Sequence, residues 1–551
     1  MSETFDVCIV GSGAAGGIAA YVLTQKGLKV ALLEAGRPVD PSRDYLEHVW
    51  PYELRNRGFG KGAQLKRQFR GSEFWSHLAS ANLPGEPYTV AGGKEFYWYR
   101  TRLVGGRTNV WGRKSLRFST NDFKARSLDG AGDDWPIDYE DVAPYYDRVE
   151  RLIGVTGTRE RLPNLPDGIF QPAPPFRCYE NLIKKGAAKL GIPVIAQRFA
   201  VITQPHDGRA PCHYCGACQR GCVTASRFSS NQVLVPKALA TGNLTLLSES
   251  MAVEITVDDE NRATGVVYVD RSAGQTREVR CRAVVVAGGT LESTRLLLHS
   301  SSRRFRTGIA NSSGALGKNF MEHMGGSVSG YFPQLEAAKP FNEDGILSGH
   351  AFIPWWGYNR KNPHLRGYHV EMGGGSQMFP GHAYGTDGFG SGLKKKVRAM
   401  NPAVFGLGTH GEMLPNSQTY VELDREVKDA WGIPVLKIHF QYGENERLMF
   451  RSTIEALQEI VVASGGKVRS VSRDLRPPGQ SIHELGTARM GNDARTSVVN
   501  RFCQAHDVQN LFVNDGACFV SSSDKNPTLT IMALSWRASD YLAEEMRKGN
   551  L

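Results

Sequence analysis

The feature that most constrains the fold is the opening segment FDVCIVGSGAAGGIAAYVLTQKGLKVALLEAG, residues 5–36. Residues 7–10 are apolar and predict a buried strand, the alanine-rich stretch up to about Lys26 predicts a helix, and residues 30–33 predict a second strand. A strand, a helix and a strand within one short segment indicate a βαβ unit, whose two strands lie parallel in one sheet. The segment therefore predicts an α/β fold.

The turn between the first strand and the helix carries a G-x-G-x-x-G pattern. Gly11 permits the tight turn, Gly13 lets the backbone approach a pyrophosphate, and Gly16 lets the helix pack on the strand. The phosphates would then meet the N-terminus of the helix. Glu34 ends the second strand, where a carboxylate accepts the ribose hydroxyls. The pattern predicts dinucleotide binding without separating FAD from NAD.

The composition is that of a large globular protein. With 551 residues the chain exceeds the size at which a single core stops growing, so two domains are expected. No run approaches the roughly 18 apolar residues of a membrane span.

The net charge of +11 is spread over 66 basic and 55 acidic residues, and the basic run at residues 393–400 is interpreted as a solvated surface, so no nucleic-acid partner is expected. The first strand is predicted to start at about Phe5, so no export signal is expected in the chain itself.

Three further stretches carry a resemblance to a known family. They are RLVGGRTNVWGR (residues 102–113), RAVVVAGGTLESTRLLL (residues 282–298) and the C-terminal block from His483 to Leu534, which contains HELGTARMG and NPTLT. Together with the opening unit they resemble the glucose-methanol-choline (GMC) oxidoreductases, a family of FAD enzymes that oxidise alcohols. The matches run from the first strand to the last helix, and the resemblance implies FAD as the cofactor.

The resemblance implies a Rossmann-type FAD-binding domain interleaved with a substrate domain, an α/β chain that is α+β overall. Between residues 321 and 475, short β-rich runs such as GYHVEMGG, TYVELD and PVLKIHFQY precede a helix predicted over residues 444–463. Strands separated by turns and not by helices predict an antiparallel sheet. The expected units are a discontinuous FAD-binding domain (1–180, 225–320 and 476–551), a cysteine-rich loop (181–224) and a substrate-binding domain (321–475).

The family's cofactor contacts can be carried over to matching positions. The glycine-pair loop would place Gly105, Gly106, Thr108 and Asn109 against the flavin. The resemblance also implies contacts at Val253, Gly288, Asp515, Gly516, Asn526 and Thr528. Some sugar-oxidising relatives bind FAD covalently through a histidine just before the tryptophan of this loop, whereas this chain has Val110 there. Non-covalent FAD is therefore predicted, and acid denaturation should release free flavin.

Oxidation of an alcohol calls for a base, because the O–H group does not ionise at neutral pH and hydride leaves carbon readily only as negative charge builds on oxygen. Histidine has an ordinary pKa of about 6.5, so it is mostly neutral at pH 7 and can accept the proton. The resemblance places the catalytic histidine at His483 and a partner that donates a hydrogen bond to the substrate oxygen at Asn526. His323, in NFMEHMGG, is interpreted as a structural residue near the domain junction.

Four of the nine cysteines lie in CHYCGACQRGC, residues 212–222. Their spacing, C-x2-C-x2-C-x3-C, is closer to the bacterial ferredoxin run than to the two separated pairs of structural zinc, and it favours a metal site. A subset of GMC sugar dehydrogenases carries an iron-sulfur cluster here on three cysteines, which Cys212, Cys218 and Cys222 fit. Cys215 would complete a 4Fe-4S cluster or stand beside a 3Fe-4S cluster. Zinc or a pair of disulfides is the alternative. The remaining cysteines are expected to be small buried apolar residues: Cys8, Cys178, Cys281, Cys503 and Cys518.

The resemblance is strongest to the iron-sulfur sugar dehydrogenases, which include glucoside 3-dehydrogenases and the large subunits of gluconate 2-dehydrogenases. The expected reaction is oxidation of a secondary alcohol of a sugar, first of all C3 of a glucoside. Aldose, polyol or gluconate oxidation at C1, C2 or C5 is the alternative. Two rivals are an oxygen-using sugar oxidase with a structural zinc loop and an electron carrier without a substrate. Trp355, Trp356 and Tyr358 are candidates for stacking on a sugar ring, although aromatic runs in strands are more often core.

A cluster would also imply partners. Reduced flavin holds two electrons and a cluster accepts one at a time, so the electrons would pass to cytochrome c or a similar small carrier. Related enzymes often work in the periplasm, so export with a small subunit that carries the signal is expected, and residence in the cytoplasm is the alternative.

Overall fold

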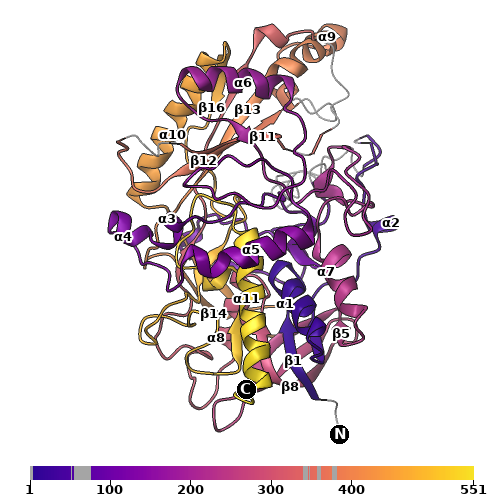
Figure 1. Ribbon diagram of the computed structural model, residues 1–551, viewed down its shortest axis with the longest axis vertical. Coiled ribbons are helices and arrows are strands. Elements are labelled where there is room, and N and C mark those ends of the chain that lie inside the picture. The colour runs from indigo at the N-terminus through magenta and orange to yellow at the C-terminus, as the bar shows by residue number, and fades with distance from the viewer. Residues whose placement is uncertain are drawn as a thin grey trace.

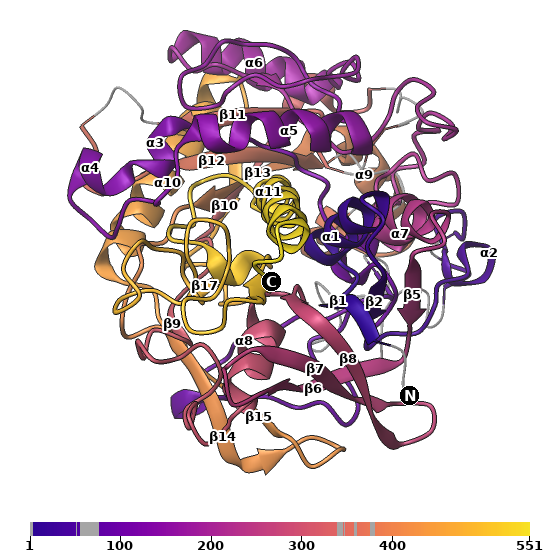
Figure 2. The same ribbon diagram turned by 60° about the horizontal axis from the view of Figure 1, so that its bottom comes forward.

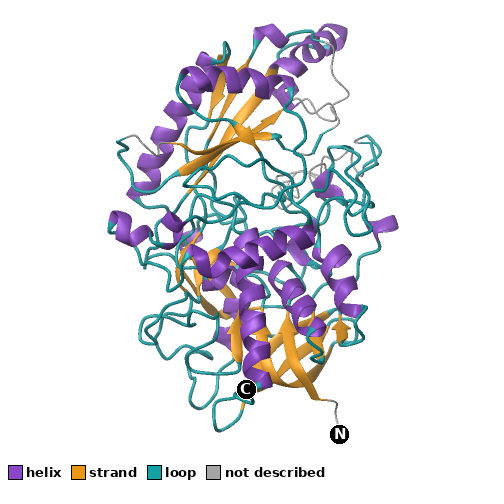
Figure 3. Ribbon diagram, in the orientation of Figure 1, coloured by secondary structure: helices purple, strands orange, loops and turns teal. Residues whose placement is uncertain are grey.

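The structure is a computed structural model that describes residues 4–50, 52–54, 76–338, 345–346, 348–356, 361–374 and 381–551. In Figure 1 the lower part of the molecule holds the βαβ unit and the C-terminal helix, and the upper part holds a separate sheet covered by helices. Figure 3 shows strands in both parts, with helices packed beside them. The chain crosses between the two parts several times, so each part is built from segments that are distant in sequence.

The opening unit forms as predicted. β1 (Thr4–Val10) leads into α1 (Ala14–Gln25), and β2 (Val30–Leu33) returns parallel to β1. Side chains alternate across a strand, and β1 uses this alternation to enter two cores. Val7 and Ile9 pack with Ala19 of α1, whereas Cys8 belongs to the large core that also contains Trp135.

The βαβ unit belongs to a sheet of seven strands within the described residues. The order is β5–β2–β1–β8–β7–β6, and β18 pairs with the second half of β8. β5, β2, β1, β8 and β18 run parallel, whereas β7 and β6 are antiparallel to their neighbours. The further bounds are β5 (Leu244–Leu247), β6 (Ser250–Val257), β7 (Ala263–Asp270), β8 (Gln275–Val286) and β18 (Leu511–Val513). We call this the lower sheet below.

Helices cover the lower sheet. α1 lies between α7 (Ser230–Leu239) and α11 (Thr528–Arg547), and α5 (Tyr139–Ile153) packs against α11 (Figures 1 and 2). α5 begins after Asp138, whose backbone N–H donates to Asp141 at 3.0 Å, as in a capping box. α8 (Thr290–His299) follows β8 through the small-residue turn, as the sequence predicts. Three short helices complete this part: α2 (Pro41–Asp44), α3 (Thr120–Phe123) and α4 (Ala125–Asp129).

The upper part contains the predicted antiparallel sheet. Its order is β16–β10–β13–β12–β11–β4, and each of its pairs is antiparallel. α10 (Glu444–Ala463) forms over the predicted residues and packs on β10, β13 and β16 and against α6 (Cys178–Lys189); α9 (Gly390–Met400) lies further along the same part. The strands are β4 (Ile195–Ala196), β10 (Ser327–Tyr331), β11 (Ala351–Trp356), β12 (Tyr368–Gly374), β13 (Val404–Gly411) and β16 (Lys467–Val471).

The runs TYVELD and PVLKIHFQY form strands, but not in the upper sheet. They belong to a third sheet of order β17–β9–β14–β15–β3, where β15 runs parallel to β3, a strand from far earlier in the chain. Its strands are β3 (Thr89–Val90), β9 (Lys318–Met321), β14 (Tyr420–Lys428), β15 (Pro434–His439) and β17 (Leu485–Thr487). The single sheet expected from residues 321–475 is therefore two sheets, because β14 and β15 find partners beside α8 of the lower part.

No helix in the described part of the chain is both long enough and apolar enough to cross a membrane.

Candidate active site

A cavity of about 1410 Å³ is lined from both parts of the molecule. The turn between β1 and α1 lines it, and so do residues of β12 and β13. Predicted cofactor and catalytic residues that line the cavity are Gly11, Gly13, Glu34, Gly106, Thr108, Gly288, His483, Asp515, Gly516, Asn526 and Thr528. The structure thus brings most of the predicted site together in one continuous space.

The three glycines of the first turn occupy different environments. Gly11 has φ of +95°, and a Cβ added to it would lie 2.6 Å from the carbonyl oxygen of Ala287. A Cβ on Gly13 would meet nothing within 4 Å, so the Gly13 backbone faces open space at the start of α1. A Cβ on Gly16 would lie 1.7 Å from the Gly11 carbonyl oxygen. Gly13 therefore leaves room for a phosphate, whereas Gly16 permits the contact between helix and strand.

Glu34 is held at the edge of the cavity. Its carboxylate accepts hydrogen bonds from the Ser12 backbone N–H at 3.1 Å, the Ser12 hydroxyl at 2.5 Å and the Gly36 N–H at 2.7 Å. Ser12 Oγ in turn accepts from the N–H of Gly105 at 2.8 Å. This network joins the first glycine turn to the glycine-pair loop and presents a fixed carboxylate to the cavity, which fits the hydroxyls of a ribose.

Four predicted cofactor residues lie outside the lining. Gly16 is packed as described above, and Gly105 is packed as well, because a Cβ added to it would lie 2.9 Å from the backbone nitrogen of Asn231. The Asn109 amide donates to the carbonyls of Val104 and Gly106 at 3.0 and 2.9 Å, so it holds the loop together. Val253 is displaced along β6, where the lining residues are Ser250, Met251 and Ala252, and its carbonyl accepts from His299 at 2.9 Å.

The C-terminal block supplies the opposite wall. Asp515 accepts hydrogen bonds from the Gly289 N–H at 2.8 Å and the Ser293 hydroxyl at 2.5 Å, and burial raises the pKa of its carboxyl group. α11 begins at Thr528, which lines the cavity together with Pro527. The positive end of the α11 dipole therefore faces the cavity, where it would stabilise negative charge on a bound group.

The two predicted catalytic residues face each other across the cavity wall. His483 lies just before β17 and Asn526 just before α11, and His483 Nε2 is 3.4 Å from Asn526 Nδ2. His323 Nδ1 lies 2.7 Å from His483 Nδ1 on the other side of the ring. Burial, followed by the neighbouring rings of His323 and His410, holds the pKa of His483 well below its usual value. His483 is thus neutral at pH 7.

A polar group that the sequence analysis missed lies on the upper sheet. Residues two apart share one face of a strand, so His369 and Glu371 of β12 point the same way, and His410 of β13 lies directly opposite His369. Glu371 is 3.2 Å from His369 Nε2 and 3.6 Å from His410 Nε2, and it forms an ion pair with Lys114. Burial opposes ionisation, yet Lys114 and His410 hold the pKa of Glu371 well below its usual value. The pattern H-x-E within a β-rich run was the available signal.

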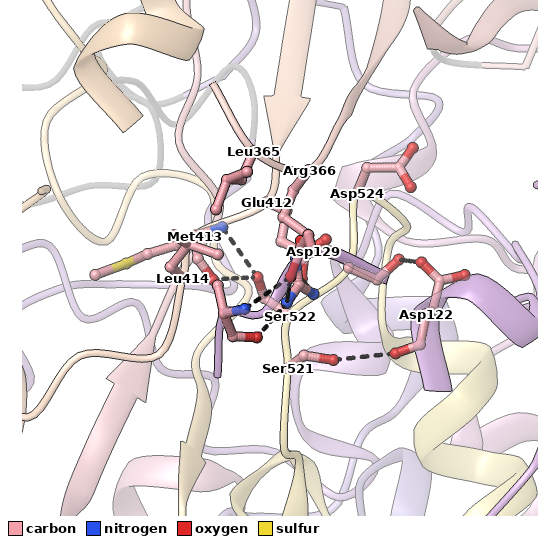
Figure 4. Close-up of polar contacts among 12 residues, drawn as sticks. Asp122, Asp129, Leu365, Arg366, Glu412, Met413, Leu414, Ser521, Ser522 and Asp524 are labelled. Atoms are coloured by element: carbon pink, nitrogen blue, oxygen red, sulfur yellow. Dashed lines mark hydrogen bonds and ion pairs between the residues drawn. The ribbon is translucent and has the colours of Figure 1, made fainter. Parts of the chain in front are cut away.

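The segment that carries Asn526 is fixed by buried polar groups (Figure 4). Ser521 donates to the Asp122 carbonyl oxygen at 3.4 Å, and the Ser522 hydroxyl bonds to the backbone of Met413. Lys525 lies between Asp122 and Asp524, with Nζ at 3.1 and 2.6 Å from their carboxylates. We call residues 521–526 the anchored segment.

Arg366 extends this network toward the upper part (Figure 4). Its guanidinium pairs with Asp129 and lies 3.0 Å from Glu412 Oε1. Burial raises the pKa of Glu412 to about 7 although Arg366 opposes the shift, and the carboxylates of Asp122 and Asp524 add to it.

The cysteine-rich loop lies beside the cavity. Cys218 packs with Phe199 and Ile346, Cys212 lies against them, and Cys215 lines the cavity. Burial, with the Cys218 thiol next, raises the pKa of Cys212 and of Cys215 to about 12. Cys222 is buried as well.

The thiols are near one another but not at the spacing of a single ion. Among the described residues, the group placed to hold one ion is His323, His410 and His483, which contains no cysteine. Of the five other cysteines, four are buried as expected, whereas Cys178 is exposed at the start of α6, so that expectation was wrong. Tyr358 and the side chains of Trp355 and Trp356 lie outside the described part of the structure.

Comparisons with known proteins agree with this architecture. Two sequence profiles, both described as GMC oxidoreductase, match residues 6–325 and 415–535. The fructose dehydrogenase large subunit of Gluconobacter japonicus is 27% identical over 99% of this chain and 98% of its own. The 2-methyl-1,2-propanediol dehydrogenase of Mycolicibacterium austroafricanum is 29% identical over 98% of this chain and 96% of its own.

A solved structure supports the same fold. The crystal structure of pyridoxine 4-oxidase from Mesorbium loti matches with a TM-score of 0.64 and 17% identity, and it covers 99% of both chains. The N-terminal profile alone spans more than half of the sequence. The chain is therefore a member of the GMC oxidoreductases, the FAD-dependent enzymes that oxidise CH–OH groups of alcohols and sugars.

Proposed function

We propose that this protein is an FAD-dependent dehydrogenase that oxidises a secondary alcohol of a sugar, with C3 of a glucoside as the first candidate. The observation that carries the proposal is the meeting of a neutral histidine, His483, with Asn526 and the Glu371–Lys114 pair in the cavity that also contains the glycine turn. An electron carrier without a substrate would not call for such a constellation.

The roles of the catalytic residues follow from their chemistry. His483 accepts the hydroxyl proton, because its neutral ring has a nitrogen free to bind it. Asn526 donates a hydrogen bond from Nδ2 to the same oxygen, which stabilises the negative charge that develops there. FAD, when bound, supplies the acceptor for the hydride. Gly13, Glu34 and the N-terminus of α11 would hold it.

The cavity offers partners for more than one hydroxyl. The His410 Nδ1 and Asn526 Oδ1 atoms are buried and have no hydrogen-bond partner among the described residues, and substrate hydroxyls would satisfy them. Lys114 compensates the charge of Glu371, which favours a neutral polyol over a cationic amine. Fructose and 2-methyl-1,2-propanediol, the compounds for which the two relatives are named, both carry neighbouring hydroxyls.

A dye-linked screen under anaerobic conditions tests this assignment. Methyl glucosides, glucose, gluconate, fructose and 1,2-diols are offered in turn, and the product ketone is located by NMR. A 3-keto glucoside supports the first candidate. Oxidation at C1, C2 or C5 would replace it by the aldose, polyol or gluconate alternative, and no turnover with any of these compounds would contradict the proposal.

We also propose that Cys212, Cys218 and Cys222 hold an iron-sulfur cluster, with Cys215 as a fourth ligand or a neighbour. The C-x2-C-x2-C-x3-C spacing in the sequence supports this proposal, because it is closer to the bacterial ferredoxin run than to the two separated pairs of structural zinc. The buried guanidinium of Arg113 lies within electrostatic reach of the three favoured thiols and would compensate negative charge there.

The cluster would pass electrons one at a time to cytochrome c or a similar carrier. The relative from Gluconobacter japonicus is named as a large subunit, which supports a partner subunit here as well. We propose that such a subunit carries the export signal and that the assembly works in the periplasm, with a cytoplasmic location as the alternative. Iron and acid-labile sulfide assays on protein purified without oxygen test the cluster. Zinc in place of iron, with hydrogen peroxide formed from oxygen, would favour the oxidase rival.

A further inference from the structure

We propose that His323 is a positioning residue that fixes the ring proton of His483 on Nδ1 and so leaves Nε2 as the atom that accepts the substrate proton. The inference rests on the proposed function, because it concerns the base of that reaction. It also changes the interpretation of His323, which the sequence analysis treated as structural.

His323 Nε2, the ring nitrogen that points away from His483, is a hydrogen-bond donor. His323 Nε2 lies 2.7 Å from the carbonyl oxygen of Ser523 and 3.3 Å from that of Ser522. A carbonyl oxygen only accepts hydrogen bonds, so Nε2 must carry a proton. Burial lowers the pKa of His323 to about 4, so the ring is neutral and has no second proton. Its Nδ1 is therefore an acceptor.

The acceptor at His323 Nδ1 determines which nitrogen of the catalytic His483 ring carries the proton. His323 Nδ1 and His483 Nδ1 are 2.7 Å apart. Two lone pairs at that distance repel each other, so His483 must donate its Nδ1–H to His323. A neutral imidazole has one ring proton, so His483 Nε2 carries a lone pair. That atom faces the Asn526 amide and the cavity.

The groups around His323 are held in place by hydrogen bonds. The Ser523 hydroxyl donates to Asp122 at 2.6 Å, which fixes the carbonyls of the anchored segment. The backbone of His323 is held too, because its carbonyl accepts from Ser481 at 2.9 Å and from Tyr442 at 3.3 Å. One short segment thus determines the tautomer of the base through His323 and also carries its partner, Asn526.

The charged surroundings are consistent with a neutral pair of rings. The other titratable groups that act on His323 and His483 are His410, His369, Glu371 and Asp524. His410 lies on the cavity side, with ring centroids 5.2 Å from His483 and 6.0 Å from His323. None of these groups intervenes in the contact between the two Nδ1 atoms.

The consequence can be tested by replacing the acceptor. A free imidazole exchanges its proton between both nitrogens, so without an acceptor at Nδ1 part of His483 holds the proton on Nε2 and cannot act as the base. His323→Leu removes the acceptor. His323→Gln keeps an oxygen to accept from His483 and an amide to donate to Ser523. His350 is the matched control, because it is buried outside the cavity lining, both of its ring nitrogens are hydrogen-bonded, and burial lowers its pKa to about 4 as well.

The readout is the rate of flavin reduction at saturating substrate without oxygen, with FAD content and melting temperature recorded for each variant. We expect His323→Leu to lower this rate by roughly 10²-fold or more with little change in the substrate concentration for half-saturation. We expect His323→Gln to stay within about tenfold of the parent. We expect His350→Leu, if it binds FAD, to retain the parent rate. An unchanged rate in FAD-loaded His323→Leu would overturn the proposal, and so would equal losses in the Leu and Gln variants.

NMR measures the tautomer of His483 directly. The measurement requires no substrate turnover, and a single variant is needed to assign the signals. The ¹⁵N spectrum of histidine-labelled protein at neutral pH distinguishes protonated from unprotonated ring nitrogens, and His483→Asn assigns the signals. The expected result is a protonated Nδ1 and an unprotonated Nε2 for His483. A protonated Nε2 with an unprotonated Nδ1 would contradict the proposal. If no alcohol reduces the flavin, the proposed function fails on its own, while this spectrum still decides the tautomer.

Discussion

At the scale of single residues, the surroundings of His483 keep its imidazole ring uncharged. Burial and the rings of His323 and His410 hold its pKa well below the usual 6.5, so the base remains unprotonated until the solution is distinctly acidic. We expect the rate of flavin reduction to be flat from pH 8 to below pH 6.5 and to fall only at lower pH. Stopped-flow reduction over this range checks the expectation, with FAD retention as control; a decline centred near pH 7 would contradict it.

Replacement of the two catalytic residues should separate chemistry from binding. His483→Ala should lower flavin reduction by roughly 10²- to 10⁴-fold because the base is lost, and Asn526→Ala should lower it less because only a hydrogen bond is lost. FAD content should stay near that of the parent. His439→Ala, on β15 outside the cavity lining, is the control and should leave the rate unchanged. Equal rates in His483→Ala and the parent would remove His483 from the mechanism.

The residues that could be predicted from sequence are those with local motifs. His483 and Asn526 have distinctive neighbours, so single positions could be assigned. Glu371 and His410 could not, because their meeting depends on the register of β12 against β13, which no local pattern reveals. Val253 was predicted to contact the cofactor but lies outside the cavity lining. Which residues of β6 line the cavity depends on how the strand lies against it, and no local pattern reveals that.

At the scale of elements, the first turn and α1 show how identical residues take different roles. Gly13→Ala should fold normally and bind FAD more weakly, because the new methyl group enters open space where a phosphate would lie. Gly16→Ala should lower the melting temperature or prevent folding, because its Cβ would overlap the Gly11 carbonyl. Thermal unfolding and flavin content distinguish the two variants. Gly392→Ala, on α9 outside the cavity lining, is the control, because its Cβ would meet nothing within 4 Å. A destabilised Gly13→Ala with normal FAD affinity would contradict this division of roles.

The anchored segment depends on Lys525. Lys525→Met leaves the carboxylates of Asp122 and Asp524 buried without their cation, which we expect to cost on the order of 3–5 kcal/mol in the free energy of unfolding. Urea unfolding measures the change. Lys548→Met, at the partly exposed end of α11, is the matched control and should leave the free energy of unfolding nearly unchanged. Similar values for both variants would show that the buried network does not stabilise the segment.

Elements with local signals were predicted well, whereas the membership of strands in sheets was not. The βαβ unit and α10 were predicted because their strands and helix are marked by continuous sequence patterns. β14 and β15 were predicted as strands but assigned to the wrong sheet, since the alternation of their side chains is the same whichever sheet they join. Their partners, β3 and β9, lie far away in the chain.

At the scale of the whole molecule, buried carboxyl groups link stability to pH. The pKa of Glu412 is about 7 in the folded protein and near 4.5 when unfolded, so the unfolded chain loses this proton first as pH rises. The contribution of Glu412 to stability therefore falls between about pH 4.5 and pH 7, by up to about 3 kcal/mol. Glu412→Gln should flatten the melting temperature over this range, and exposed Glu459→Gln should not. A parallel pH dependence in Glu412→Gln and the parent would refute the assignment.

The proposed cluster gives a prediction about electron flow through the molecule. Cys218→Ser should lose iron while sugar still reduces the flavin, because Cys218 is not part of the lining of the cavity that contains His483 and Asn526. Transfer to cytochrome c should then fall sharply. Cys178→Ser, at an exposed position, should retain both activities. Retention of stoichiometric iron in Cys218→Ser would exclude that thiol as a ligand.

The pairing of β18 with β8 has a consequence for biosynthesis. Glycines from the start of the chain form one side of the site, whereas β18, the anchored segment and α11 come from its last stretch. A nascent polypeptide on the ribosome therefore displays an incomplete sheet whose central strand still awaits a neighbour. Stable cofactor capture must wait until β18 and α11 have been synthesised, and chains that terminate before them should be cleared by proteases as empty, unstable fragments.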